Sequence, residues 1–417
     1  MAEAAPKTVR RNAALNVADG ALFTFGLSFA SAATVLPVFV ERLGGGAVAV
    51  GAIPVVWAVG MNVPQVFAAH RAQHAESRKR LVLVTALAQR LPWLLLAVGT
   101  AWWLGNATPA AGLTFFFAVY GLAAVAGAVA VPAWFDLVTA LTPVGIRGRL
   151  FAARAVTGAV LSIVAGVVSV VVLEAFVYPT NFAVLFGLAF AGVMGSYAML
   201  ALLRDDVPVR RARRIEPALF LRRLPRLLRR QPALRGLLVA DALVVVGGVA
   251  GAFFAVDAIA RFGLPISAAG QFTAVMAAAT VVASPLAGVA ADRRGHRGNL
   301  ALAGWATAAA ALVAWLAPTA GVYLVAFALS AAALALRTVS RLPLIAELAP
   351  EADRPSYVAL SNALTAPFAA VGVAAGWAVE RYGTDAVFAG ATAAGAASAY
   401  WMTTRVREPR HSAPGLR

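Results

Sequence analysis

Five ionisable side chains interrupt stretches of the sequence that are otherwise long and apolar. They are Asp19, Arg90, Asp136, Asp241 and Arg337. A charged group near the centre of a bilayer costs about 2.5–3.5 kcal/mol on insertion scales, so each of them needs a partner or a function. Burial favours the neutral form of a carboxyl group and a neighbouring arginine favours its charged form, which are the ingredients of proton coupling. These five residues are therefore our candidates for a substrate or proton site.

Two interpretations of these charges stay open on the sequence alone. Arg90 lies about nine residues into its apolar stretch, or roughly 14 Å at 1.5 Å per residue, too deep to reach the surface easily. It forms either a structural ion pair, for which Asp19 and Asp136 are the nearest carboxylates, or a direct contact with solute or proton. Asp19 and Asp241 either belong to a functional site or only balance the N-terminal ends of their helices.

Composition explains why a membrane is the expected surrounding. The chain has 417 residues, of which 61% are hydrophobic and 13% are charged, whereas a soluble domain has about a quarter charged residues. The formal charge of +17 comes from arginines that lie between apolar runs, so we exclude a nucleic-acid partner. The chain has no cysteine and only four histidines. We therefore expect no metal site, no cofactor and no enzymatic activity.

The apolar runs predict an all-α membrane protein with twelve transmembrane helices, because each run can cross a core roughly 30 Å thick. The predicted spans are 14–40, 47–69, 81–103, 110–141, 150–173, 181–203, 236–260, 267–290, 299–317, 320–342, 356–378 and 384–403. The short polar N-terminus has no cleavage site followed by soluble sequence, so we expect no removable signal peptide.

The loops between these spans alternate in charge from end to end. Arginine is concentrated in one set of loops, which includes both termini, and is sparse in the other set. Positively charged loops stay in the cytoplasm, so we expect a multi-pass protein of the cytoplasmic (inner) membrane with both termini inside the cell. The strong preference for arginine over lysine indicates a GC-rich genome and hence a bacterial source.

An arginine-rich break divides the chain into four predicted parts. These are a first six-helix bundle over 1–203, a linker over 204–235, a second bundle over 236–404 and a cytoplasmic tail over 405–417. Apolar residues of the linker fall on one helical face with arginines around them. The linker therefore either lies on the anionic inner leaflet or is a solvated tether.

Short segments of the two halves match in the same order. Val17-Ala18-Asp19 matches Val239-Ala240-Asp241, Arg42-Leu43-Gly44 matches Arg261-Phe262-Gly263, and Leu141-Thr142-Pro143 matches Leu348-Ala349-Pro350. Each match alone could arise by chance, but their common order indicates a duplicated six-helix unit. Two such units related by a pseudo-two-fold axis, with a site between them, suit alternating access.

One loop carries a recognisable signature. The segment from Gly288 to Arg297 reads GVAADRRGHR. It resembles the G-x-x-x-D-R-x-G-R-R motif of the major facilitator superfamily, with histidine at one position where arginine is usual. The resemblance implies a gating motif formed by Gly288, Asp292, Arg293, Gly295 and Arg297. We expect Gly288 to permit close helix approach. The equivalent loop of the first half has alanine and glutamine in place of the glycine and aspartate.

The resemblance also implies a fold and a function. In that family the first, fourth, seventh and tenth helices line a central cavity, and these would carry Asp19, Asp136, Asp241 and Arg337 at similar depth. We therefore expect a monomeric secondary transporter that moves a small organic solute by alternating access, coupled to protons. The alternatives are a facilitator without proton coupling, and a non-transporting sensor or assembly partner built on the same scaffold.

Overall fold

The computed structural model describes residues 6–72, 77–205, 231–349, 357, 361–362 and 364–406. All regular elements of these residues are helices. The first half of the chain contains α1 (Pro6–Ser28), α2 (Val35–Arg42), α3 (Ala47–Ala72), α4 (Arg78–Trp102), α5 (Pro109–Leu141), α6 (Arg147–Ala175) and α7 (Thr180–Ala201). The second half contains α9 (Pro232–Gly248), α10 (Phe254–Phe262), α11 (Ala268–Arg294), α12 (His296–Leu316), α13 (Ala320–Leu348), α15 (Val371–Tyr382) and α16 (Thr384–Arg405). Short 3-10 turns accompany them at Leu104–Asn106, Val144–Ile146, Val249–Ala252 and Ala366–Ala370.

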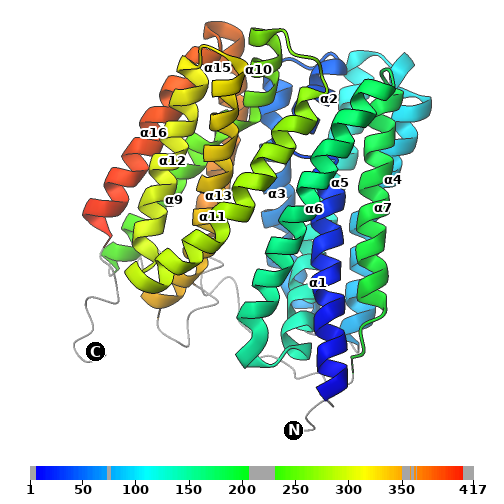
Figure 1. Ribbon diagram of the computed structural model, residues 1–417, viewed down its shortest axis with the longest axis vertical. Coiled ribbons are helices and arrows are strands. Elements are labelled where there is room, and N and C mark those ends of the chain that lie inside the picture. Colours follow the sequence, from blue (N-terminus) through cyan, green and yellow to red (C-terminus); the bar gives the residue numbers. More distant parts are fainter. Residues whose placement is uncertain are drawn as a thin grey trace. The chain divides into compact units, whose positions relative to one another are not determined.

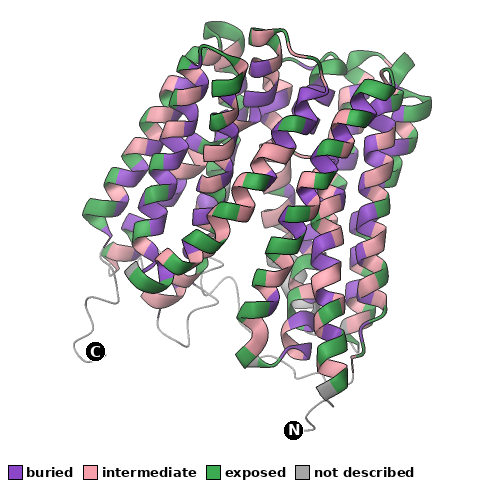
Figure 2. Cartoon of the chain, in the orientation of Figure 1, coloured by how far each residue is buried: buried purple, intermediate pink, exposed green. Residues whose placement is uncertain are grey.

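Eight helices of the described residues are long and apolar enough to cross a membrane, and Ala47–Asn62 is a shorter apolar helix. The apolar sequence of these helices continues over surfaces that no other described residues cover. On α4 and α6 the exposed apolar positions recur about every three or four residues, so they lie along one face of each helix. These positions are Val84, Leu87, Leu91, Leu94, Leu95 and Val98 on α4, and Val156, Val160, Val164, Val167 and Val171 on α6. Figure 2 shows exposed segments recurring along the long helices. A soluble protein rarely exposes apolar stripes of this length, whereas lipid chains cover them.

The residues group into two compact units. Unit 1 comprises Met1–Gly45, Val56–Arg213 and Pro265–Ala274, and unit 2 comprises Gly46–Val55, Arg214–Leu264 and Val275–Arg417. In unit 1, α1 packs against α6 and α7, and α4 packs against α5 and α7. In unit 2, α12 packs against α13 and α16, and α9 packs against α16. Figure 1 shows these neighbours as long helices that run side by side within their own unit.

The first predicted span, 14–40, is wrong as a single helix. The structure ends α1 at Ser28 and begins α2 at Val35. The carbonyl of Ser31 accepts hydrogen bonds from the backbone N–H groups of Val35 and Leu36, which starts the new helix. Pro37 is tolerated there because the first turn of a helix does not need its missing N–H. Hydropathy did not reveal this break because the apolar run continues across it.

One of the repeated sequence segments folds the same way in both halves. α2 ends at Arg42 and α10 ends at Phe262, and each is followed by a glycine with positive φ. These are Gly44, with φ of 84°, and Gly263, with φ of 61°. A residue with a side chain rarely adopts this conformation, so the shared glycine gives both helices a similar end. This likeness supports the duplication inferred from the sequence.

Candidate functional site

Asp19 of α1 is buried in unit 1 and is bonded to three other helices. Its Oδ2 accepts hydrogen bonds from Nη1 of Arg154 on α6 at 2.8 Å and from Nε1 of Trp134 on α5 at 3.3 Å. Its Oδ1 accepts a hydrogen bond from the hydroxyl of Ser196 on α7 at 2.6 Å. The guanidinium of Arg154 also lies over the Trp134 ring, 4.7 Å from its centroid. One carboxylate therefore ties together four helices of this unit.

Arg90 of α4 is 3% exposed and reaches this carboxylate indirectly. Its Nε donates to the backbone carbonyl of Val193 at 2.7 Å, and its Nη1 donates to that of Ala86 at 2.9 Å. Its Nη2 donates to the hydroxyl of Ser196 at 2.9 Å, and that hydroxyl donates in turn to Asp19. Because every guanidinium nitrogen is bonded to the protein, the geometry favours the structural interpretation of Arg90 over a direct contact with solute.

Asp241 of α9 is the centre of the corresponding cluster in unit 2. Its Oδ1 lies 2.7 Å from Nε of Arg337, and its Oδ2 lies 2.7 Å from Nε of Arg341, both on α13. Asp241 is only 5% exposed, while the side chains of Arg337 and Arg341 are 25% and 11% exposed. Arg337 and Arg341 are four residues apart, so both project from the same face of α13. A single carboxylate is thus shared by two cations.

Arg341 is also held by the segment that precedes α15. Its Nη1 donates to Oδ1 of Asn362 at 2.8 Å, and its Nη2 donates to the hydroxyl of Thr365 at 3.3 Å. The sequence predicts Asp241 and Arg337 but not Arg341 as site residues, because an arginine near the cytoplasmic end of a span fits the positive-inside pattern equally well. The spacing of Arg341 from Arg337 was the signal that could have found it.

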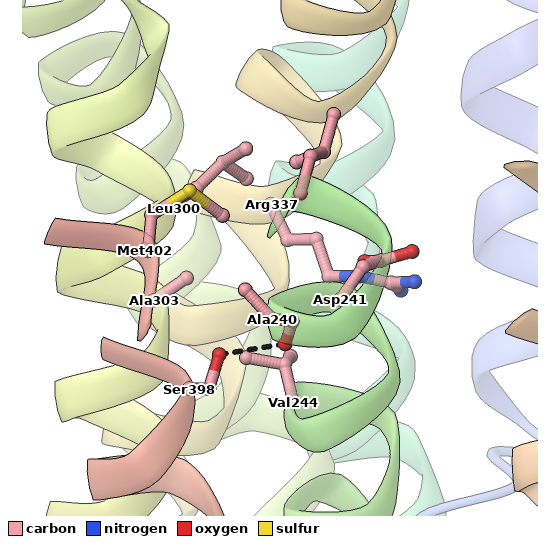
Figure 3. A pocket seen from close by; sticks show the side chains of 9 residues that line it. Ala240, Asp241, Val244, Leu300, Ala303, Arg337, Ser398 and Met402 are labelled. Carbon is pink, nitrogen blue, oxygen red and sulfur yellow. Dashed lines mark hydrogen bonds and ion pairs between the residues drawn. The ribbon is translucent and has the colours of Figure 1, made fainter. Parts of the chain in front are cut away.

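A small pocket adjoins the Asp241 cluster. It is lined by Leu237, Ala240, Asp241, Val244, Leu300, Ala303, Arg337, Ser398 and Met402. The volume of this pocket is about 10 Å³, which is room for one water molecule. Figure 3 shows that the carboxylate of Asp241 and the guanidinium of Arg337 meet on the side of α9 away from Met402 and Leu300. The charged groups therefore point away from the apolar core of the unit.

Asp136 differs from the other four candidate residues. It lies on α5 and is exposed, whereas Asp19, Arg90 and Asp241 are buried and Arg337 is intermediate. The side chains bonded to Asp19 are Arg154, Ser196 and Trp134, none of which was among the candidates from the sequence. Trp134 lies two residues before Asp136 on α5 and therefore on another face of that helix. Counting residues along a helix gives the depth of Asp136 but not the direction in which it turns.

The segment 288–297 joins α11 to α12. Gly295 separates the two helices with a φ of 83°, so this position needs glycine. Asp292 and Arg293 are exposed on the last turn of α11. Arg297 donates from Nη2 to the carbonyl of Thr403 on α16 at 2.5 Å. The contact ties the start of α12 to the end of α16 within unit 2.

The structure also bears on Gly288 and places the residue that departs from the motif. A Cβ built on Gly288 meets no atom of the described residues within 4 Å, so the close helix approach expected there stays a prediction. The departing residue, His296, is buried, with its Nε2 3.8 Å from a carboxylate oxygen of Glu347 on α13. The linker prediction falls mainly on residues 206–230, and the tail prediction on 407–417, which lie outside the described residues. Within the part of the chain that the structure describes, no three His, Asp or Glu side chains lie close enough to hold a metal ion.

Known proteins resemble this chain in the sequence of its second half and in the fold of nearly its whole length. A family model described as Major Facilitator Superfamily matches residues 242–417. No curated protein matches the chain. Among solved structures, a D-xylose-proton symporter is similar at a TM-score of 0.72 and 15% identity, over 97% of this chain and 99% of that one. The nucleoside transporter NupG is similar at 0.69 and 12%, over 95% of this chain and 98% of that one. A POT family transporter in complex with 5-aminolevulinic acid is similar at 0.73 and 11%, over 94% and 95%.

These likenesses confirm the expected all-helical membrane fold, and at such identities the structures show the fold alone. The family match falls on the half that contains the 288–297 signature, which agrees with the resemblance noted in the sequence. The sequence match to that family covers residues 242–417, and the solved transporters show that the whole chain shares their fold.

Proposed function

We propose that this protein is a proton-coupled secondary transporter of a small organic solute, which works by alternating access between two related six-helix halves. The observation that carries the proposal is the pair of carboxylates Asp19 and Asp241. Each lies buried on the first long helix of its half and is neutralised by arginines of neighbouring helices. Protonation of either carboxyl group removes the charge that holds those arginines, and therefore changes contacts between helices.

The remaining features of the proposal come from the sequence. Twelve spans, both termini in the cytoplasm and a place in the cytoplasmic membrane follow from the apolar runs and the arginine-rich loops. We propose that the linker 204–235 rests on anionic lipid of the inner leaflet and that the protein acts as a monomer. The shared ends of α2 and α10 support the duplicated halves. The D-xylose-proton symporter shares the fold of this chain, and this likeness supports the proposed proton coupling.

The test uses vesicles that contain the purified protein and a trapped pH-sensitive dye. Small organic solutes are added one at a time, and a transported solute is recognised because it moves protons across the membrane with it. We expect Asp241→Asn and Asp19→Asn to abolish this proton movement, and Asp385→Asn, at an exposed site at the start of α16, to leave it unchanged. Solute flux that is indifferent to the pH gradient leaves a facilitator, and binding without flux leaves a sensor.

A further inference from the structure

The cluster around Asp241 contains more positive than negative charge. Arg337 and Arg341 both bond to this one carboxylate, so the bonded set carries a net charge of about +1. An uncompensated charge within a membrane span is costly, and such groups mark substrate or ion pathways. One of the two arginines therefore carries a surplus charge.

The hydrogen bonds show which arginine it is. Arg341 uses all three of its guanidinium nitrogens, on Asp241, Asn362 and Thr365. Arg337 uses only Nε, on Asp241. Within the described part of the chain, the two terminal nitrogens of Arg337 donate to no acceptor, although they belong to a side chain that is three-quarters buried. Arg341 is therefore the structural partner of Asp241, and Arg337 retains binding capacity.

The corresponding cluster in unit 1 also has two arginines, Arg90 and Arg154, around one carboxylate, Asp19. It stabilises the second positive charge in another way. There Arg90 is fully bonded, and the second cation, Arg154, lies over the indole ring of Trp134. The electron-rich face of an aromatic ring stabilises a cation. No aromatic ring among the described residues covers Arg337, so its charge is not met in this way.

We propose that Arg337 is the binding group for the anionic end of the transported solute, a carboxylate or a phosphate oxyanion. The two terminal nitrogens of a guanidinium present parallel N–H groups that match two oxygens of such an anion. One bound monoanion brings the net charge of the cluster to zero. The amide nitrogen of Asn362, whose Oδ1 is occupied by Arg341, adds a further donor to the bonded set. A cationic solute is repelled by the same surplus charge.

This inference rests on the proposed function only in that the bound solute is also carried across the membrane, and binding itself is measured without any flux. The purified full chain in detergent is heated with a panel of small monocarboxylates and phosphate monoesters, with benzoate and inorganic phosphate as the simplest members. Uncharged amides and alkylammonium ions of the same size form the comparison panel. We expect thermal stabilisation by members of the anionic panel alone.

Three variants decide whether Arg337 is responsible. Arg337→Gln is expected to weaken binding of the stabilising anions about tenfold or more, because hydrogen bonds to charged groups contribute roughly 1.5–3 kcal/mol. Arg337→Lys keeps the charge and loses the paired geometry, so it is expected to retain part of the affinity. Arg381→Gln removes an equal charge from an exposed site at the end of α15 and is expected to change nothing.

Several results would overturn the inference. These are stabilisation by uncharged or cationic compounds only, anion binding that survives Arg337→Gln, and no anion binding at all. Stabilisation by phosphatidylglycerol that requires Arg337, without any effect of small anions, would assign the group to a lipid headgroup and also overturn it. Proton-coupled flux of a neutral solute would defeat this inference and leave the proposed function standing. Anion binding that requires Arg337, without flux of any solute, would support this inference and contradict the proposed function.

Discussion

The guanidinium of Arg154 lies directly over Gly20. A Cβ built on Gly20 would stand 2.7 Å from the Cζ and Nε atoms of Arg154, closer than real Cβ atoms approach. Gly20 follows Asp19 in the sequence, so the absence of a side chain here opens the path by which Arg154 reaches that carboxylate. The residue next to Asp241 is instead Ala242, and there the arginines approach from α13.

Gly20→Ala is therefore expected to displace Arg154 from Asp19 while α1 still forms, since alanine favours a helix more than glycine does. We expect proton-coupled flux to fall at least severalfold, measured in the dye-loaded vesicles. Gly187→Ala on α7 is the matched control, because a Cβ there meets no atom within 4 Å. Equal flux in both variants would show that the contact between Arg154 and Asp19 does not matter for transport.

Ser196→Ala is expected to destabilise unit 1 by about 1–3 kcal/mol, because it leaves both Nη2 of Arg90 and Oδ1 of Asp19 without their shared partner. The measurement is reversible unfolding in mixed micelles. Ser169→Ala is the control, since the buried hydroxyl of Ser169 donates only to a carbonyl of its own helix. If both variants lower the free energy of unfolding equally, the hydrogen bonds of Ser196 to Arg90 and Asp19 add no stability beyond that of an ordinary buried serine.

Asp241 and Arg341 are expected to be strongly coupled in stability. Asp241→Asn leaves two arginines in the span without a counter-charge, and removing one partner of a buried pair costs about 3–5 kcal/mol. Arg341→Gln removes one of those cations, so the double variant should be less destabilised than the sum of the two single variants. A double-mutant cycle on unfolding in micelles measures the difference, which we expect to be about 1–3 kcal/mol. Additive effects would contradict the ion pair.

Gly295→Ala is expected to destabilise the joint between α11 and α12 by about 1–3 kcal/mol, because a side chain rarely adopts the φ of 83° found there. Gly298→Ala, three residues further into α12, is the control, since its Cβ meets open space and alanine suits a helix interior. The two variants are compared by thermal unfolding in detergent. Similar melting temperatures of the two variants would show that the backbone at residue 295 can adopt another conformation without loss of stability.

The sequence predicted the long helices well, because an apolar run of membrane length has few other solutions. Most predicted spans begin and end within a few residues of the helices, as for 181–203 against Thr180–Ala201. The exceptions are the spans that hydropathy cannot subdivide. The run 14–40 contains a turn around Ser31, and the run 236–260 contains a 3-10 turn at Val249–Ala252. The run 356–378 contains a 3-10 turn at Ala366–Ala370, after which α15 covers Val371–Tyr382.

The partners of the buried charges could not be predicted, because they depend on how each helix is rotated about its axis. Asp19 and Arg154 are far apart in the sequence and meet only through the packing of α1 on α6. The same rotation leaves Asp136 exposed while Trp134 turns towards Asp19. Arginines near the cytoplasmic ends of the spans fit the positive-inside pattern. Two of them form ion pairs instead, Arg154 with Asp19 and Arg341 with Asp241.

The bridge through Ser196 also fixes which way the hydrogens around Asp19 point. Nη2 of Arg90 can only donate, so the single hydrogen of the Ser196 hydroxyl must face Oδ1 of Asp19. Hydrogens of Arg154 and Trp134 face the other oxygen, Oδ2. Each oxygen of the carboxylate thus accepts a hydrogen bond from a helix other than α1, so a shift of α5, α6 or α7 removes a donor from Asp19. In this half of the molecule, three helices together fix the orientation of one carboxylate.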